Sequence, residues 1–358
     1  MDPRPLNILL VRPGLLGDLL CATPMLAAIK QHFPFARLNV LCSPYSLALM
    51  RRNPDVDQVY VNVHTRQTER NLHPGRMRAW LDYLKLIHAL RRARFDYAIV
   101  CGATFDKPGV RLAERSHAKV IIGGTCEDGS YQGRLDIPMP GLLRMEHHAI
   151  RVFRLLAPLG IPLSALPPTL SLSPDPVAVD AVHAHFLPAG SVRYVGVHIT
   201  SREPSRLWPV ECFAAVIRQL VLADPRWVFM LMWERGDEAR GQALQAALAD
   251  LPVYVHPPGT LEYAIAALSL CDWVLCHEGG ALHMAAALGR PIVGLFDGLP
   301  GKYECWYPWG VPYELACSDP GLAIPDLPVE RVYDAALRLI KRLDEPRAIA
   351  LCKCLSKK

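Results

Sequence analysis

The sequence predicts an α/β fold built from two doubly wound domains that face a common cleft. The chain has 358 residues, which is more than twice a typical domain of about 150. Half of the residues are apolar and 20% are charged, a composition that excludes a disordered chain and a coiled coil. Short apolar runs alternate with longer segments of helical period, which is typical of strand–helix units around parallel sheets.

The first half contains five runs that predict strands, at residues 6–11, 38–42, 58–63, 97–100 and 120–122. The clearest helix is expected over residues 77–94. Its apolar stripe is formed by Trp80, Leu84, Ile87 and Leu90, and basic residues at its end suit the helix dipole. A second helix is expected over residues 146–159.

A domain boundary is expected in residues 160–176, which are rich in proline and serine, as interdomain segments often are. We therefore expect a first domain over residues 1–170 and a second over residues 171–358. Strands of the second domain are expected at residues 194–198, 228–232, 253–255, 273–276 and 291–295. Helices are expected to start near Pro209, Asp237, Thr260 and Ala281, and a last helix to span residues 329–343.

Charge and cysteine content indicate the compartment. The net charge of +5 argues only weakly for nucleic acid. A cluster such as Arg91, Arg92 and Arg94 suits an anionic substrate or a membrane surface, with a solvated helix face as the alternative. Eleven cysteines without a signal-peptide pattern favour a reducing cytoplasm. No apolar stretch approaches the roughly 20 residues of a membrane span, so we expect a cytoplasmic protein that is soluble or peripheral.

The first motif is Val-Arg-Pro-Gly-Leu-Leu-Gly-Asp at residues 11–18. It leaves a predicted strand, turns on Gly14 and Gly17, and places Asp18 where a helix begins. The motif lacks both the GxGxxG pattern and the Walker lysine, so it does not indicate a dinucleotide or triphosphate site. A simple N-cap role for Asp18 is equally open at this stage.

The second motif is His-Glu-Gly-Gly-Ala-Leu-His at residues 277–283. Its paired glycines, Gly279 and Gly280, let backbone N–H groups approach a phosphate or diphosphate at a helix N-terminus. The two histidines are six residues apart across the glycines, which excludes a zinc-protease site. His283 alone is typical of a helix-packing residue rather than a catalyst.

Two further loops carry polar side chains. The loop at residues 200–209 holds Thr200, Ser201 and Arg206 before a proline-started helix, a setting that suits a diphosphate leaving group; the alternative is a solvated capping loop. Glu238 stands where it can accept hydrogen bonds from ribose hydroxyls, or where it is only an exposed acidic helix start. Since ligands of parallel sheets bind beyond the carboxyl ends of strands, we expect these loops to face the cleft.

Taken in order, these motifs resemble those of the ADP-heptose glycosyltransferases, which are the bacterial lipopolysaccharide heptosyltransferases of glycosyltransferase family nine. The resemblance includes Arg-x-Trp-Pro at residues 206–209, Glu-Gly-Gly-x-x-His followed by Ala-Ala-Ala-Leu-Gly-x-Pro, and a Glu-His-His-x-Ile helix ending in Leu-Gly-Ile-Pro. It spans nearly the whole chain. It implies the GT-B fold, which has two Rossmann-like domains facing a cleft. The acceptor would bind on the first domain and the nucleotide sugar on the second, and a last helix would cross back to the first.

The resemblance also implies roles for the first-domain turn and the Arg-x-Trp-Pro loop. Asp18 matches the family's catalytic base, in a turn shaped by Gly14 and Gly17. Arg206 falls where many members have a lysine on the diphosphate, and the hydroxyls of Thr200 and Ser201 match its neighbours.

At the second-domain turn the chain departs from the family pattern. Glu278 stands where most members have the aspartate of Asp-Thr-Gly-Pro, and Gly279 and Ala281 replace the threonine and the proline. We expect Glu278 to hold sugar hydroxyls, and the N–H groups of residues 279–282, up to Leu282, to hold the diphosphate. Leu-Phe-Asp-Gly at residues 295–298 also departs from the commoner Phe-Gly-Pro.

The implied activity is an inverting transfer of heptose from ADP-heptose to a hydroxyl of the lipopolysaccharide inner core, without a cofactor or catalytic metal. The acceptor would be a lipid-linked saccharide, which suits peripheral contact with the inner membrane. Two alternatives stay open: transfer to protein hydroxyls, as in the autotransporter heptosyltransferase branch, and a non-catalytic nucleotide-sugar binding module. That branch carries iron on cysteines, for which the candidates here are Cys305, Cys317, Cys352 and Cys354.

Overall fold

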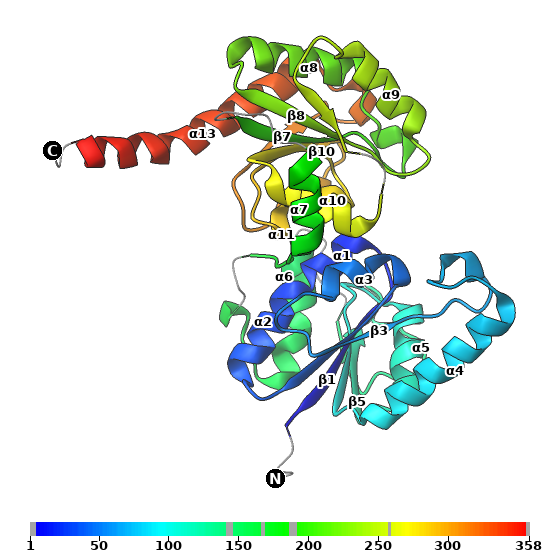
Figure 1. The fold of residues 1–358 in the computed structure, drawn as a ribbon. Coiled ribbons are helices and arrows are strands. Elements are labelled where there is room, and N and C mark those ends of the chain that lie inside the picture. Colours follow the sequence, from blue (N-terminus) through cyan, green and yellow to red (C-terminus); the bar gives the residue numbers. More distant parts are fainter. Residues whose placement is uncertain (1–4, 141–145, 166–168, 186–191, 257–258, 356–358) are drawn as a thin grey trace. The chain divides into compact units, whose positions relative to one another are not determined.

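The computed structural model describes residues 5–140, 146–165, 169–185, 192–256 and 259–355, with side chains described up to residue 345. The chain divides into two compact units, Met1–Ser173 and Pro174–Lys358. Each unit is built around one six-stranded sheet flanked by helices (Figure 1).

The sheet of the first unit has the strand order β3-β2-β1-β4-β5-β6, and each strand runs parallel to its neighbours. The strands are β1 (Asn7–Arg12), β2 (Arg37–Cys42), β3 (Gln58–Val61), β4 (Tyr97–Val100), β5 (Val120–Gly124) and β6 (Ile137–Met139). The helices are α1 (Leu16–Cys21), α2 (Thr23–His32), α3 (Leu47–Met50), α4 (Arg76–Ala93), α5 (Lys107–Ser116) and α6 (His148–Phe153). Residues 8–11 of β1 are buried without interruption, because helices cover both faces of such a sheet.

The strand order places a topological switch point between β1 and β4. The chain moves from β1 outward to β2 and β3, and then returns to add β4 on the other side of β1. The loops after β1 and β4 therefore leave the same carboxyl edge in opposite directions, which is where ligands of such sheets bind.

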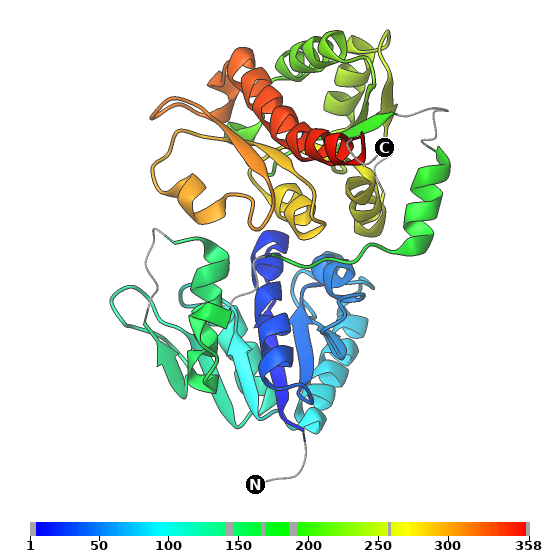
Figure 2. The same ribbon diagram turned by 90° about the vertical axis from the view of Figure 1, so that its left-hand side faces the viewer.

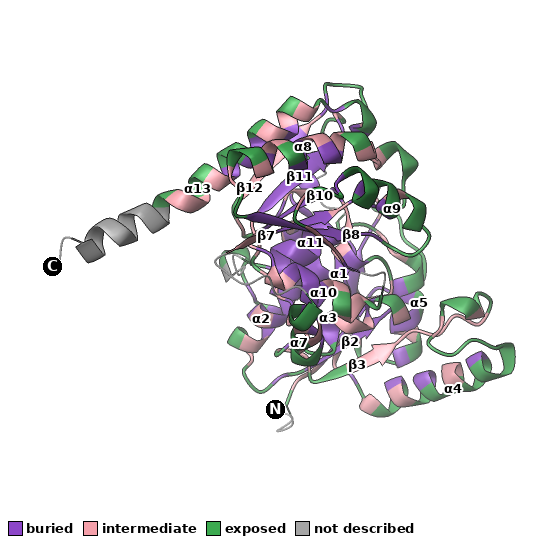
Figure 3. Ribbon diagram, turned by 45° about the horizontal axis from the view of Figure 1, so that its top comes forward, coloured by how far each residue is buried: buried purple, intermediate pink, exposed green. Residues whose placement is uncertain are grey.

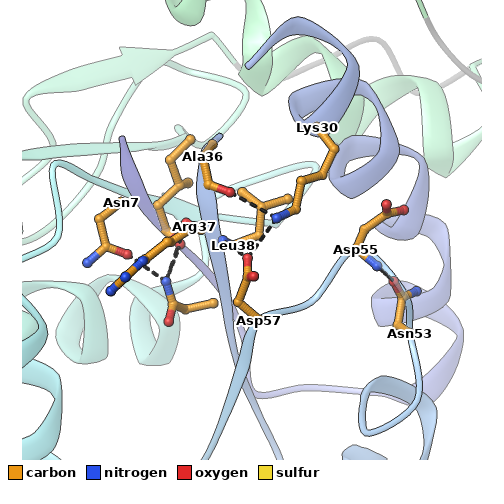
Figure 4. A network of polar contacts seen from close by, with 10 residues as sticks. Asn7, Lys30, Ala36, Arg37, Leu38, Asn53, Asp55 and Asp57 are labelled. Atoms are coloured by element: carbon orange, nitrogen blue, oxygen red, sulfur yellow. Dashed lines mark hydrogen bonds and ion pairs between the residues drawn. The ribbon is translucent and has the colours of Figure 1, made fainter. Parts of the chain in front are cut away.

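The opposite edge of this sheet is held by a structural network (Figure 4). Lys30 of α2 donates to the Ala36 carbonyl at 2.9 Å and to Asp57 Oδ2 at 2.8 Å, and the same carboxylate oxygen accepts the Leu38 N–H at 2.7 Å. These contacts tie α2 to the starts of β2 and β3, so this carboxylate is part of the scaffold.

The predicted apolar stripe of α4 is only partly correct. The buried side chains of this helix are Ala79, Leu86, Ile87 and Leu90. Ile87 and Leu90 are therefore confirmed, whereas Trp80 and Leu84 are 57% and 54% exposed. Figure 3 shows buried, intermediate and exposed residues along α4. The helix is apolar over more of its circumference than one packing face needs, and Leu86, Ile87 and Leu90 are the side chains that pack into the core.

The predicted helix at residues 146–159 is also shorter than expected. Only α6 is α-helical, and residues Arg154–Leu159 continue as a 3₁₀ helix that contains Pro158. The ring of Pro158 removes the N–H that an α-helix would direct to the carbonyl of residue 154.

The second unit repeats this architecture, with the strand order β12-β11-β10-β7-β8-β9. Its strands are β7 (Arg193–His198), β8 (Trp227–Met232), β9 (Val253–Val255), β10 (Trp273–His277), β11 (Ile292–Phe296) and β12 (Tyr313–Cys317). Its helices are α7 (Pro176–His185), α8 (Val210–Ala223), α9 (Glu238–Ala247), α10 (Leu261–Leu270), α11 (Gly280–Ala287), α12 (Lys302–Trp306) and α13 (Val329–Leu355). The switch point lies between β7 and β10.

The long helix α13 packs on α8, β11 and β12 of its own unit (Figure 2). The edge strands β6 and β12 and the helix α7 were not predicted, because their short or proline-bounded runs read as loop. Within the part of the chain that the structure describes, the helices are all too short or too polar to cross a membrane.

Candidate active site

The first cluster of charged groups surrounds Asp18, in the first turn of α1. The N-cap of this helix is Leu15, and no side chain caps it. The Asp18 carboxylate, in a residue only 8% exposed, instead lies 3.0 Å from Nη2 of Arg12 and 3.2 Å from Nε2 of His148. Asp18 is therefore not an N-cap, and each of its two oxygens faces a different nitrogen-bearing side chain.

Arg12 connects the loops on the two sides of the switch point. It ends β1, and its Nη1 lies 3.2 Å from Oδ2 of Asp106, beyond β4. Asp106 in turn accepts the N–H of Gly109 and so caps α5. Burial lowers the pKa of Arg12, but the carboxylates of Asp18 and Asp106 outweigh it and leave that pKa raised.

His148 begins α6 and is almost fully buried. Burial, the charge of Arg12 and the nearby Arg151 hold its pKa well below the ordinary value for histidine. The imidazole beside Asp18 is therefore neutral at physiological pH, and orients the carboxylate without adding charge.

The glycines of the first motif shape this turn. Gly14 lies in the exposed loop between β1 and α1, where an added Cβ would stand 3.6 Å from the guanidinium carbon of Arg12. Gly17 lies in the first turn of α1, next to Asp18.

The second cluster spans the switch point of the second unit. Arg206, in the 3₁₀ turn Pro204–Arg206 after β7, places Nη1 2.8 Å from Oε2 of Glu278, directly after β10. Lys302 Nζ lies 3.6 Å from the same oxygen and also pairs with Asp297. Two cations and two carboxylates thus alternate at one edge of the sheet.

The backbone of the Arg206 loop is anchored on both sides. The N–H of Trp208 donates to Nε2 of His277 at 3.0 Å, and its indole N–H donates to the Leu327 carbonyl at 2.8 Å. Arg240 donates to the carbonyls of Ile199 and Trp208. Burial, aided by His198 and Arg240, lowers the pKa of His277 to about 3, so the ring stays an uncharged acceptor.

Thr200 and Ser201 stand where this loop leaves β7. Oγ1 of Thr200 accepts the N–H of Glu234, and Oγ of Ser201 accepts the N–H of Glu203, each at 3.3 Å. The hydroxyl oxygens thus hold the loop in place, and each hydroxyl also carries a proton that it can donate.

The helix start at α11 has the geometry that its glycines predict. Gly279 has φ 153° and ψ −161°, a region that only glycine adopts readily. An added Cβ at Gly279 would meet nothing within 4 Å, and no side chain caps the helix. The N–H groups of Gly280, Ala281 and Leu282 form the first turn, where a helix has no partners of its own for them.

Two further residues that the sequence predicts for this site, His283 and Glu238, make contacts outside the charge cluster. His283 is buried, and its ring packs edge-on against Trp306 at 5.7 Å, which is the packing role that the sequence favoured. Glu238 is an exposed residue at the start of α9, and its carboxylate accepts the Gly236 N–H at 2.9 Å.

The cysteine candidates do not form a described metal site. Cys305 is buried and Cys317 is partly buried. The side chains of Cys352 and Cys354 lie outside the described residues. Among the residues that are described, no three His, Cys, Asp or Glu side chains gather as metal ligands.

Sequence reasoning did not select five residues of these clusters: Arg12, Asp106, His148, Asp297 and Lys302. Signals existed for three of them. Arg12 lies inside the first motif, His148 in Glu-His-His-x-Ile, and Asp297 in the Leu-Phe-Asp-Gly departure. Asp106 and Lys302 have no local signal, because only the strand order brings them to these clusters.

Comparisons with a family model and with curated proteins indicate one family. The family model described as glycosyltransferase family 9 (heptosyltransferase) matches residues 83–320. A curated relative, lipopolysaccharide heptosyltransferase 2 of Salmonella typhimurium strain LT2, is 22% identical over 300 residues, covering 81% of this chain and 82% of the relative.

Two solved structures share the fold. A glycosyltransferase family 9 protein from Veillonella parvula has a TM-score of 0.78 at 17% identity, covering 96% of this chain and 99% of that one. The E. coli heptosyltransferase WaaC with ADP has a TM-score of 0.73 at 18% identity, covering 93% and 100%. The predicted fold class is confirmed.

Proposed function

Because the chain belongs to glycosyltransferase family 9, the heptosyltransferases, and is a glycosyltransferase, we propose that it moves heptose from ADP-heptose to a hydroxyl of the lipopolysaccharide inner core. We propose inversion at the anomeric carbon and a direct displacement. The observation that carries this proposal is the position of Asp18, a nearly buried carboxylate in a helix that it does not cap.

Asp18 acts as the general base in this proposal. It takes the proton of the acceptor hydroxyl as the oxygen attacks the anomeric carbon, a step typically worth about 10²–10⁴-fold. Arg12 and His148 are positioning residues, because each contacts a different oxygen of the carboxylate. Gly14 and Gly17 form the turn that brings the acceptor to this carboxylate.

The second unit binds the donor. As the bond to the diphosphate breaks, negative charge grows on the leaving oxygens, where preorganised donors have the largest effect. Arg206 and the hydroxyls of Thr200 and Ser201 supply such donors, together with the N–H groups at the start of α11. Arg206 keeps a side chain 30% exposed, so it can exchange Glu278 for a phosphate.

Glu278 then holds hydroxyls of the donor sugar, and Glu238 those of the ribose. Lys302 adds a second positive charge beside Glu278. With two cations for the diphosphate, we propose that transfer needs no metal ion and no cofactor. The acceptor, a lipid-linked saccharide on the first unit, is at the cytoplasmic face of the inner membrane in this proposal.

The experiment that tests the proposal is a donor panel. Purified protein and a core saccharide acceptor are incubated with ADP-heptose, a UDP-sugar or a GDP-sugar, with and without EDTA, and the product is identified by mass spectrometry and NMR. We expect transfer from ADP-heptose alone, unaffected by EDTA, with the inverted anomer. Tight ADP-heptose binding without transfer to any saccharide or peptide hydroxyl would instead identify a non-catalytic module.

A further inference from the structure

The outer face of α4 carries large apolar side chains that its own unit leaves exposed. Met77 is 81% exposed, Trp80 57%, and Leu81 and Leu84 are each 54% exposed. At 100° per residue, the four occupy one sector of the helix, in its first two and a half turns. A solvated surface helix is expected to place polar residues there. All seven tryptophans lie in the described part of the chain, and Trp80 is the one that is exposed.

Positive charge is concentrated on the same segment. Residues 64–94 contain eight lysines and arginines against two acidic residues, a net charge of +6, whereas the whole chain is only +5. The rest of the molecule is therefore slightly negative. Arg78, Lys85 and Arg92 recur at seven-residue intervals, so they follow one edge of the exposed apolar sector, and all three are exposed.

From this combination we infer that the outer face of α4, formed by Met77, Trp80, Leu81 and Leu84 with Arg78, Lys85 and Arg92, docks on an anionic phospholipid surface. Helices that lie in a bilayer interface insert Trp and Leu side chains below the headgroups and place Lys and Arg among them. Each basic residue near such a surface adds attraction. A second copy of the chain is a poor occupant, because its own residues 64–94 would bring a like charge of +6.

The position of this face within the first unit suits an enzyme whose acceptor is a lipid-linked saccharide. A helix that follows a parallel strand starts at the carboxyl edge of the sheet, and α4 follows β3 through residues 62–75 (Figure 1). Its first turns, which carry the apolar residues, are thus at the edge where β1 presents Asp18. The inference itself depends on exposure and charge, and it stands without the proposed activity.

The test is binding of the full chain to vesicles of phosphatidylcholine alone or with phosphatidylglycerol, free of any saccharide. We expect sedimentation with the anionic vesicles and a blue shift of Trp80 emission. Trp80→Ser with Leu84→Ser, and Arg78→Glu with Lys85→Glu, should each weaken binding at least about tenfold.

Two control variants make the same kinds of substitution at exposed residues outside α4. Phe35→Ser with Leu222→Ser removes two other exposed apolar side chains, 86% and 87% exposed, and Arg111→Glu with Lys341→Glu makes the same charge change. Both should bind as the parent does.

Equal binding by all variants, absence of binding by the parent, or a change of oligomeric state in the α4 variants would each overturn the inference. Transfer to a water-soluble acceptor should be unchanged in all four, so failure here is distinct from failure of the proposed activity.

Discussion

Arg206 and Glu278 form an ion pair of 2.8 Å that joins the loops on the two sides of the second unit's switch point. The first unit has the equivalent arrangement, with Arg12 and Asp106 at 3.2 Å across its own switch point. In each unit an arginine at the end of the first strand or in the loop after it faces a carboxylate in the loop after the fourth. In the activity that we propose, an incoming diphosphate has to compete with Glu278 for the guanidinium of Arg206.

Replacing Arg206 tests its role at the leaving group. Arg206→Ala should reduce transition-state stabilisation by about 2–4 kcal/mol, mostly in turnover, since the diphosphate gains charge as it leaves. Arg206→Lys should restore much of the loss. Steady-state kinetics of the three proteins decide the matter, and equal turnover of the alanine variant and the parent would place the diphosphate elsewhere.

Replacing Glu278 separates sugar from nucleotide. Glu278→Gln keeps the size of the side chain but loses the charge that holds sugar hydroxyls, at about 1–3 kcal/mol for ADP-heptose. ADP alone should bind as tightly as before or more tightly, because Arg206 is released from its ion pair. Calorimetry with both ligands gives the comparison. Equal losses for the two ligands would assign Glu278 to the nucleotide.

The start of α11 requires glycine at residue 279. Gly279→Ala should cost about 1–3 kcal/mol of strain at the observed φ and ψ and move the first-turn N–H groups, so that ADP affinity drops with the melting temperature. Gly289→Ala is the control, at the other end of the helix, where φ is 71° and an added Cβ also meets nothing. It should lower stability while leaving ADP affinity intact. The two variants having the same ADP affinity would argue against this diphosphate site.

The buried His277 should make the free energy of unfolding decrease as the pH falls. Its pKa is lowered to about 3 by burial and by His198 and Arg240, whereas an unfolded histidine has a pKa of about 6.5. Below pH 6.5 the unfolded chain binds a proton that the folded chain refuses. The contribution is therefore complete above pH 6.5 and is lost as the pH falls, by about 2 kcal/mol at pH 5.

The check is urea unfolding between pH 7 and pH 5. His277→Gln keeps an acceptor for the Trp208 N–H and does not titrate, so its free energy of unfolding should depend less on pH. The exposed His73→Gln should follow the parent. A parallel pH dependence of parent and His277→Gln would show that His277 protonates in the folded protein.

The central strands and the motif loops were predictable, because continuous apolar runs such as residues 8–11 and 273–276 are fully buried and are followed within three residues by a proline or a glycine. The edge strand β12 was not predicted. Its residues are mostly half-buried and follow a loop rich in aromatics. The apolar stripe predicted for α4 was partly wrong for the opposite reason. Trp80 is as apolar as a core residue, and yet its side chain is exposed.

Some residues of the candidate site could likewise be predicted from the sequence, and others could not. Asp18, Arg206 and Glu278 follow strands in recognisable turns, so the sequence selects them. Asp106 and Lys302 reach their partners only through strand order, 94 residues from Arg12 and 24 residues from Glu278 along the chain. Local patterns carry no information about such distant contacts.

The most direct test of the account is single-turnover heptose transfer from ADP-heptose by the parent and by Asp18→Asn, with donor affinity measured alongside. The variant keeps the shape of the side chain and removes the base, so transfer should fall by about 10²–10⁴-fold while donor affinity changes little. Asp57→Asn, which removes a scaffold carboxylate at the opposite edge of the same sheet, should transfer at nearly the parent rate. Near-normal transfer by Asp18→Asn would contradict the assignment of Asp18 as the base.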